Sequence, residues 1–304
     1  MDQITHVDVL CVGLASYDLV FSVSEPPGED DKMPASSFTQ CGGGPAANAA
    51  VTVSRLGYRS AFVGYLGNDL FGSIHLEELL ADNVLTDCII RGSQHTLLSA
   101  ITVLPDGRRS VVYYRAGPGS IPDTQVDLSG IRPKVILFDG HEPQISMDLV
   151  NTYRDTDVKT ILDAGSIHSG TEKLVSEVDY LVCSEKFGRQ FTRQQDEERA
   201  AALLSHHAPV VVITLGERGL VWKTPRGSGH LPALPVKCVD STGAGDSFHG
   251  AFAACIAGGF DLPDALEYAS AVAALTCTRL GARPGIPFKA DVELFLNSRS
   301  TKQG

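Results

Sequence analysis

Short apolar runs recur along the chain and are separated by longer stretches with helical periodicity. The runs are rich in Val, Ile and Leu, which is typical of strands buried on both faces. We expect strands over 7–13, 60–64, 134–138, 159–163, 180–183 and 209–214. Residues 46–56, between the first two strands, predict a helix that ends at Gly57. Residues 72–81, after the second strand, predict another helix. Strands that alternate with helices indicate an α/β fold with a mostly parallel central sheet.

Two segments, 14–40 and 96–115, depart from this alternation. The second contains β-branched residues over 97–104 and 110–114 around the turn Pro105-Asp106-Gly107, which predicts a hairpin. We expect both segments to form one small antiparallel sheet that projects from the main sheet as a lid; ordinary edge strands are the alternative. The chain shows no repeat and no long linker, so we expect a single domain over 1–304.

Composition narrows the classes of function. The 304 residues carry a formal net charge of −11, which argues against nucleic-acid or anionic-membrane partners, because both require a positive surface. No apolar run reaches the roughly 18 residues of a membrane helix, and the N-terminus does not resemble a signal peptide. The seven cysteines are scattered without a C-x-x-C pair, so neither a zinc site nor a disulfide framework is indicated. We expect a cytoplasmic protein.

The segment 239–250 is the most informative part of the chain. Small residues run from Asp240 to Asp246 and lead into an apolar helix, so a glycine turn presents unpaired N–H groups at a helix N-terminus. An anion fits there. Asp246 then suits a base that deprotonates a hydroxyl attacking a phosphoryl group. The alternative is that Asp246 only caps the helix. His249 is expected to pack on the helix face.

A second glycine turn lies at 40–50. Gly42, Gly43 and Gly44 allow close backbone approach to a ligand, and Pro45 is a favourable first residue for the following helix. Asn48 lies one turn further and offers both donors and an acceptor to a polyol. The turn lacks the G-K-[ST] of a phosphate-binding loop and the spacing of a dinucleotide fingerprint. By itself such a turn is usually structural.

Taken together, the two motifs resemble those of the ribokinase family, also called the phosphofructokinase-B family of carbohydrate kinases. Further segments fall in the family's order: Asp18, 55–57, 67–72, 214–219 and 281–287. The resemblance covers nearly the whole chain. It implies a ribokinase-like three-layer α/β/α fold with a mostly parallel central sheet and a small β-sheet lid.

The resemblance also implies ATP-dependent phosphorylation of an alcohol, usually on a sugar. Asp246 matches the family's catalytic base, and the amides of Gly243, Ala244 and Gly245 match its anion hole. The sugar contacts correspond to Asp18, Gly42, Gly43 and Asn48. The ATP contacts correspond to Ser184, Thr214, Gly216, Gly219, Gly243, Gly245, Ala274 and Cys277. The family's lid closes over the sugar and often forms a homodimer contact, so a homodimer through the lid is expected.

Metal binding follows the same resemblance. The family uses Mg²⁺ with ATP, and many members bind a monovalent cation such as K⁺ beside the anion hole. Asp240 and Thr242 are the side chains that match this cation site; an ordinary capped turn is the alternative. After 180–183 many members carry Asn-x-x-Glu, whereas this chain reads Ser184-Glu185-Lys186-Phe187. This departure puts magnesium binding by the segment in doubt.

The acceptor is the least determined part of the prediction. The segments 42–47 and 277–287 look most like those of 6-deoxy-6-sulfofructose kinases, with ketohexokinase-like enzymes nearby. A sulfonate requires cationic recognition, and Lys32 and Arg115 in the expected lid are candidates. A neutral ketohexose competes with a 6-substituted one, and a nucleoside of the adenosine type is a further alternative. A non-catalytic sugar- or nucleotide-binding sensor on the same fold is the alternative from another class.

Overall fold

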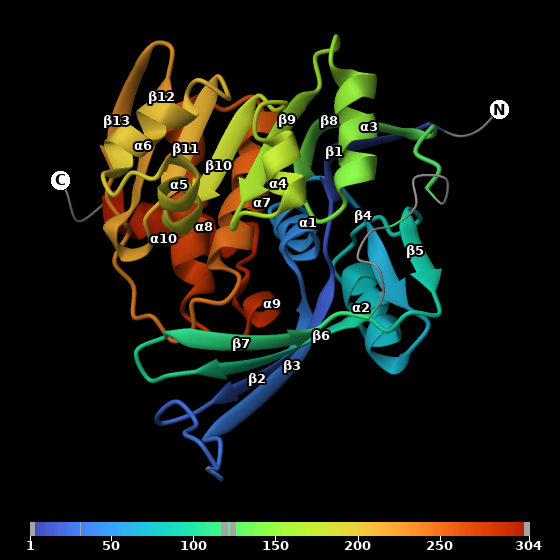
Figure 1. The fold of residues 1–304 in the computed structure, drawn as a ribbon, viewed down its shortest axis with the longest axis vertical. Helices are drawn as coiled ribbons and strands as arrows, with labels where there is room; N and C mark the ends of the chain where they lie inside the picture. Colours follow the sequence, from blue (N-terminus) through green and yellow to red (C-terminus); the bar gives the residue numbers. More distant parts are fainter. Residues whose placement is uncertain (1–3, 31, 117–120, 122–125, 301–304) are drawn as a thin grey trace.

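The computed structural model describes residues 4–30, 32–116, 121 and 126–300 (Figure 1). Its main element is a nine-stranded sheet. The strands are β1 (Thr5–Val12), β4 (Ser60–Gly67), β5 (Ile89–Gly92), β8 (Ile131–Phe138), β9 (Lys159–Ala164), β10 (Tyr180–Ser184), β11 (Val210–Thr214), β12 (Leu220–Thr224) and β13 (Gly227–Leu231). Their order across the sheet is β13-β12-β11-β10-β9-β8-β1-β4-β5. All six strands expected from the apolar runs belong to it.

Neighbouring strands run parallel from β5 to β11, and only the β12 and β13 edge is antiparallel. The expected α/β class with a mostly parallel sheet is therefore confirmed. β1 lies inside the sheet, where Cys11 faces Phe62 of β4 on one side and Leu137 of β8 on the other. A strand in that position is covered on both faces, which explains its unbroken apolar sequence.

Helices cover both faces of the sheet (Figure 1). On one face lie α1 (Pro45–Arg55), α2 (Leu70–Ala81), α7 (Ala244–Ala257), α8 (Leu262–Thr276), α9 (Ala282–Gly285) and α10 (Lys289–Ser300). On the other lie α3 (Pro143–Tyr153), α4 (Ser169–Leu174), α5 (Glu185–Thr192) and α6 (Glu197–Leu204). A 3₁₀ turn, η2 (Gly216–Arg218), follows β11. No helix within the described ranges is both long and apolar enough to cross a membrane.

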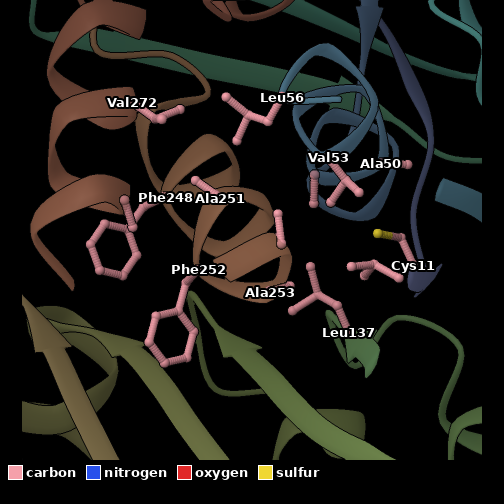
Figure 2. Close-up of a cluster of buried hydrophobic side chains, with 14 of the residues drawn as sticks. Cys11, Ala50, Val53, Leu56, Leu137, Phe248, Ala251, Phe252, Ala253 and Val272 are labelled. Carbon is pink, nitrogen blue, oxygen red and sulfur yellow. The ribbon is translucent and has the colours of Figure 1, made fainter. Parts of the chain in front are cut away.

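Alternate residues of each strand supply two separate hydrophobic cores. In β1, Val9 and Cys11 face the first group of helices, whereas Leu10 and Val12 face the second. Figure 2 shows the first core, in which residues of α1 and α7 lie together above Cys11 and Leu137 of the sheet. This two-sided burial fixes both helix layers on the same strands.

A second, smaller sheet projects below the carboxyl ends of the parallel strands (Figure 1). Its strands, in spatial order, are β3 (Ser37–Gly43), β2 (Ser16–Ser22), β6 (Leu97–Val103) and β7 (Arg109–Tyr114). The expectation of a wholly antiparallel sheet is wrong at one pair, because β2 and β6 are parallel. β2 follows β1 and β6 follows β5. Both therefore start from the carboxyl ends of parallel strands and run in the same direction.

The helices α1 and α7 approach closely through small residues. A Cβ atom at Gly250 of α7 would lie 2.6 Å from the carbonyl oxygen of Ala49 and 2.9 Å from its Cα atom. The glycine therefore lets the two backbones touch. This contact joins two segments that are about 200 residues apart in sequence, and it sets the separation of the side chains at the ends of both helices.

Gly250→Ala is expected to lower the free energy of unfolding by about 1–3 kcal/mol, because the new methyl group must push α1 away from α7. Gly188→Ala in α5 is the matched control. A Cβ at that position would lie 3.4 Å from the side chain of Ile213 in β11, which is an ordinary van der Waals distance. We expect that variant to be neutral or more stable by up to about 1 kcal/mol. Urea unfolding of both variants measures the difference, and equal stabilities would contradict the close-packing account.

Candidate active site

The two glycine motifs meet at one point, below the carboxyl ends of the parallel strands. Asn48 in the first turn of α1 donates from Nδ2 to Oδ2 of Asp246 in the first turn of α7, at 2.8 Å. Asn48 is buried, whereas Asp246 is partly exposed. The structure therefore brings the predicted polyol-binding amide and the predicted base into direct contact.

The N-terminal turn of α7 has the geometry of an anion site. Gly243 precedes the helix with φ of 77°, and a Cβ there would lie 2.5 Å from Cβ of Ala282, so the position requires glycine. The helical ladder starts with Ser247 N donating to Gly243 O at 2.9 Å. The N–H groups of Gly245 and Asp246 precede it, and the space around Gly245 is open. Ala244 N lies 3.4 Å from Ser241 O.

Asp18 of β2 forms the opposite wall. Its carboxylate is buried and accepts from Ser16 Oγ at 2.8 Å. Burial raises the pKa of Asp18, and the nearby Asp246 carboxylate raises it further, whereas hydrogen bonds from Ser16 and Ser99 lower it. A Cβ at Gly43 would lie 2.1 Å from Asp18 Oδ2, so that glycine gives the carboxylate its space. The carboxylates of Asp18 and Asp246 thus lie near enough to interact, and Gly43 lies against Asp18.

Gly42 is held from behind. Its N–H donates to Glu78 Oε2 at 2.7 Å, and a Cβ at Gly42 would lie 2.5 Å from the ring of His75. The N–H of Gly42 is therefore used within the protein. Glu78 and His75 lie on α2, and nothing in their local sequence connects them with the site.

Asp139, which directly follows β8, holds three loop and helix N–H groups beside the site. Its carboxylate accepts from the N–H groups of Leu14, Ala46 and His141 at 2.7, 3.2 and 2.9 Å. It therefore ties the end of β1 to the first turn of α1. Sequence reasoning missed this residue, although its place at the carboxyl end of an expected strand was a usable signal.

Asp163 and His249 form a buried pair beneath the first turn of α7. Asp163 Oδ2 lies 3.2 Å from His249 Nδ1, and the same nitrogen lies 2.6 Å from the carbonyl oxygen of Gly245. Burial raises the pKa of Asp163 to about 7, and the His249 ring opposes that rise. His249 is buried on the helix face, as expected, and its ring also contacts the carbonyl of Gly245 in the first turn of α7.

The predicted ATP-binding residues lie at the end of β11, in the turn that follows it, and at the end of α8. Thr214 ends β11, and Gly216 and Gly219 flank the following turn with φ of 60° and 88°. Ala274 lies in the last turn of α8 and Cys277 directly follows that helix, where its carbonyl accepts from Val239 N at 2.8 Å.

Ser184 has a structural task in this structure. Its hydroxyl donates to Gly165 O at 2.8 Å and caps α5 by accepting from Phe187 N at 3.0 Å. Glu185, in the altered segment, pairs with Arg189 and with Arg218, the latter at 2.6 Å. Two guanidinium groups thus neutralise the carboxylate that stands nearest to the missing motif.

Asp240 organises the loop before the anion site. The carboxylate is fully buried; Oδ1 accepts from Thr242 N and Oγ1 at 2.8 and 2.6 Å, and Oδ2 accepts from Gly281 N at 2.8 Å. Oδ2 retains a lone pair beyond its one bond, whereas the two bonds from Thr242 use both lone pairs of Oδ1. The described residues contain no cluster of three or more His, Cys, Asp or Glu side chains suited to a metal. A cation here would therefore need backbone carbonyls as well.

The two positively charged side chains predicted in the lid, Lys32 and Arg115, differ in their exposure to solvent. Lys32 lies exposed in the loop between β2 and β3. Arg115, just after β7, lies 3.7 Å from Oε1 of the buried Glu142. Burial raises the pKa of Glu142 to about 7, whereas the N–H of Ile121, which donates to it at 2.6 Å, and the Arg115 charge lower it. Sequence reasoning missed Glu142.

Comparison with known proteins agrees with this geometry. The chain is 28% identical to a ribokinase of Bacillus subtilis over 95% of this chain and 99% of that protein. It is 30% identical to a fructokinase of Solanum tuberosum over 90% of this chain and 89% of that protein. The structure of Arabidopsis thaliana ribokinase complexed with ribose and ATP superposes with a TM-score of 0.82, at 25% identity over 96% of this chain and 99% of the other.

The sequence model of the pfkB family carbohydrate kinases matches residues 7–289. That match takes in the strands of the main sheet, the small sheet and both glycine motifs. The chain therefore belongs to the pfkB family of carbohydrate kinases.

Proposed function

We propose that this protein transfers the γ-phosphoryl group of ATP to a hydroxyl of a sugar, with a ketohexose or a 6-substituted ketohexose as the acceptor. The observation that carries the proposal is the contact of Asn48 with Asp246 at the mouth of the α7 anion site. A sensor that only binds sugar or nucleotide has no need of a carboxylate at that mouth. The bound ribose and ATP of the Arabidopsis ribokinase structure support the pair of substrates.

The residues divide the reaction between them. Asp246 accepts the proton of the acceptor hydroxyl, whose oxygen then attacks the γ-phosphorus while the bond to the β-phosphate oxygen breaks. The N–H groups of Gly243, Ala244 and Gly245 hold the charge that develops on the transferred group. Asp18, Gly43 and Asn48 hold the sugar hydroxyls, together with the carbonyl of Gly42.

The nucleotide lies on the side of β11 and α8 in this proposal. Thr214, Gly216, Gly219, Ala274 and Cys277 contact ATP, and Ser184 contributes through the loop that it caps. Mg²⁺ bound with ATP neutralises phosphate charge. Because Glu185 is paired with two arginines, it would act on Mg²⁺ through water rather than as a direct ligand. Asp240 and Thr242, with nearby carbonyls, provide a site for K⁺.

The cysteines bear on the compartment. All seven are free thiols, and six of them are at least partly buried. Unpaired cysteines are typical of proteins in reducing compartments, where ATP is also abundant. We therefore place the protein in the cytoplasm, as a single domain with the small sheet as its lid.

The acceptor choice rests on the similarity to a fructokinase and on the lid cations. Arg115 is half-buried and points to Glu142, so it can exchange that carboxylate for an anionic group of the substrate. Lys32 is free to reach the same group when the lid closes over the sugar. Closure also excludes water, which otherwise competes for the phosphoryl group.

The outer strand of the small sheet supports a homodimer. All six residues of β7 are exposed, including Val112 at 75% and Tyr113 at 66%. An exposed apolar strand at a sheet edge favours pairing with another strand. A second copy of the chain, presenting the same strand, satisfies both the apolar surface and the unpaired backbone groups.

Asp246→Asn is expected to lower kcat by about 10²-fold or more, because the shape of the side chain is kept while the base is removed. ADP release from Mg-ATP with fructose, sulfofructose and other sugars measures the effect, and titration of ATP checks that nucleotide binding is retained. Turnover within threefold of the wild type would remove Asp246 from the role of base.

Lys32→Ala and Arg115→Ala are expected to raise KM for an anionic 6-substituted ketohexose about 10-fold or more, since each removes a charge-assisted hydrogen bond. The KM for fructose should change little. Lys159→Ala serves as the control for loss of a surface charge, because Lys159 begins β9 and lies at the end of the strand away from the candidate site. Equal effects of the lid variants on both sugars would exclude recognition of an anion.

Val112→Asp is expected to convert a homodimer into monomers, because it places a buried, unpaired charge in the pairing strand. Sedimentation velocity at matched concentrations gives the mass. Leu294→Asp, at a residue that is 71% exposed on α10, controls for added charge at an apolar surface position. A wild-type protein that sediments as a monomer would rule out the lid dimer.

A further inference from the structure

A buried arginine contacts Asn48, the residue that donates to the predicted base. Arg283 of α9 is only 4% exposed, although its guanidinium carries a full charge. Its Nε donates to Asn48 Oδ1 at 3.3 Å, its Nη2 lies 3.1 Å from His75 Nε2, and its Nη1 lies 3.6 Å from Glu78 Oε2. Burial of a charged group costs free energy unless its partners are well placed, so this position calls for an explanation.

The contact with Asn48 fixes which way its amide group points. An asparagine side chain has one carbonyl oxygen and one NH₂ group, and a half-turn about the last bond exchanges them. Because Arg283 is a donor without acceptors, it retains the oxygen of Asn48 on its own side. The NH₂ group therefore faces Asp246 Oδ2, where it donates at 2.8 Å.

The other two partners hold the guanidinium in place. Burial, and next the charge of Arg283, lower the pKa of His75 well below its usual range, so the ring is neutral and its Nε2 can accept from Nη2. Glu78 offsets the charge of Arg283 and also binds the N–H of Gly42. The same network thus positions two of the predicted sugar-binding groups, Asn48 and Gly42.

The loop that carries Arg283 also borders the anion site. Gly281 N donates to Asp240 Oδ2, and Ala282 packs against the place where a Cβ of Gly243 would lie. Arg55 donates to the carbonyls of Arg283 and Ile286 and so holds α9 against α1. Arg283 therefore spans from the loop beside the anion site to the wall that contacts the sugar.

We infer that Arg283 is a positioning residue for phosphoryl transfer: it orients Asn48 so that the Asn48 amide holds the Asp246 carboxylate toward the acceptor hydroxyl. The inference rests on the proposed function, because it assigns Asp246 as the base. Arg283 itself touches neither the sugar nor ATP in this account, and it acts through the side chain between it and the base.

The test uses Arg283→Lys, which keeps the charge but lacks the planar Nε donor that Asn48 accepts from. We expect kcat to fall by about 10²-fold, as is typical when a catalytic group is misplaced by an ångström, with KM for ATP within about twofold. Arg279→Met, an exposed arginine near the same loop, is the matched control and should retain kcat. Thermal unfolding confirms that each variant is folded.

A double-mutant cycle separates positioning from a general structural effect. In an Asn48→Ala background, Arg283→Lys should lower kcat further by less than roughly threefold, because the side chain through which Arg283 acts is already absent. Full additivity of the two losses would overturn the inference. So would a wild-type kcat in Arg283→Lys itself.

A readout without turnover distinguishes this inference from the proposed function. In the wild type, one Nδ2 proton of Asn48 should resonate downfield in the ¹⁵N–¹H spectrum, because it is bonded to a carboxylate. The shift should be lost in Arg283→Lys and retained in Arg279→Met. A shift that persists in Arg283→Lys would overturn the inference, whether or not any sugar is phosphorylated. Absence of wild-type turnover with every sugar would instead count against the proposed function.

Discussion

The site depends on one contact, the close approach of α1 to α7. Gly250 lets the α7 backbone touch Ala49, and the first turns of both helices then lie near enough for Asn48 to donate to Asp246 at 2.8 Å. The sheet below holds the two helices through one continuous core (Figure 2). Asp139, after β8, binds the first turn of α1, and Asp163, near the end of β9, lies 3.2 Å from His249 of α7, so both helices meet the carboxyl ends of parallel strands.

That pocket is unusually rich in buried carboxylates. Asp18, Asp139, Asp163 and Asp240 are each at least nine-tenths buried, and each has donors that compensate for the loss of water. Where compensation is weaker, as at Asp163, burial raises the pKa to about 7. These carboxylates repel a bare polyphosphate, so the N-terminal turn of α7 and the magnesium that accompanies ATP have complementary tasks.

Local sequence patterns predicted most of the fold, and they pointed to the two glycine turns that the structure brings together through Asn48 and Asp246. Apolar runs predicted the six strands because burial on both faces leaves no polar position, and the glycine turns predicted Gly243 and Gly43 because their backbone leaves no room for a Cβ. The parallel pairing of β2 with β6 depends on topology instead. Glu78 and Arg283 act through contacts across the fold, 36 and 235 residues along the chain, which no local pattern encodes.

In a carbohydrate kinase a sugar hydroxyl, and not water, receives the phosphoryl group from ATP. A ³¹P NMR time course of Mg-ATP, the protein and a ketohexose tests it directly, because a phosphate monoester and inorganic phosphate resonate apart. We expect a monoester signal that grows in step with ADP and is absent without sugar. Inorganic phosphate as the sole product, formed at the same rate with and without sugar, would contradict it.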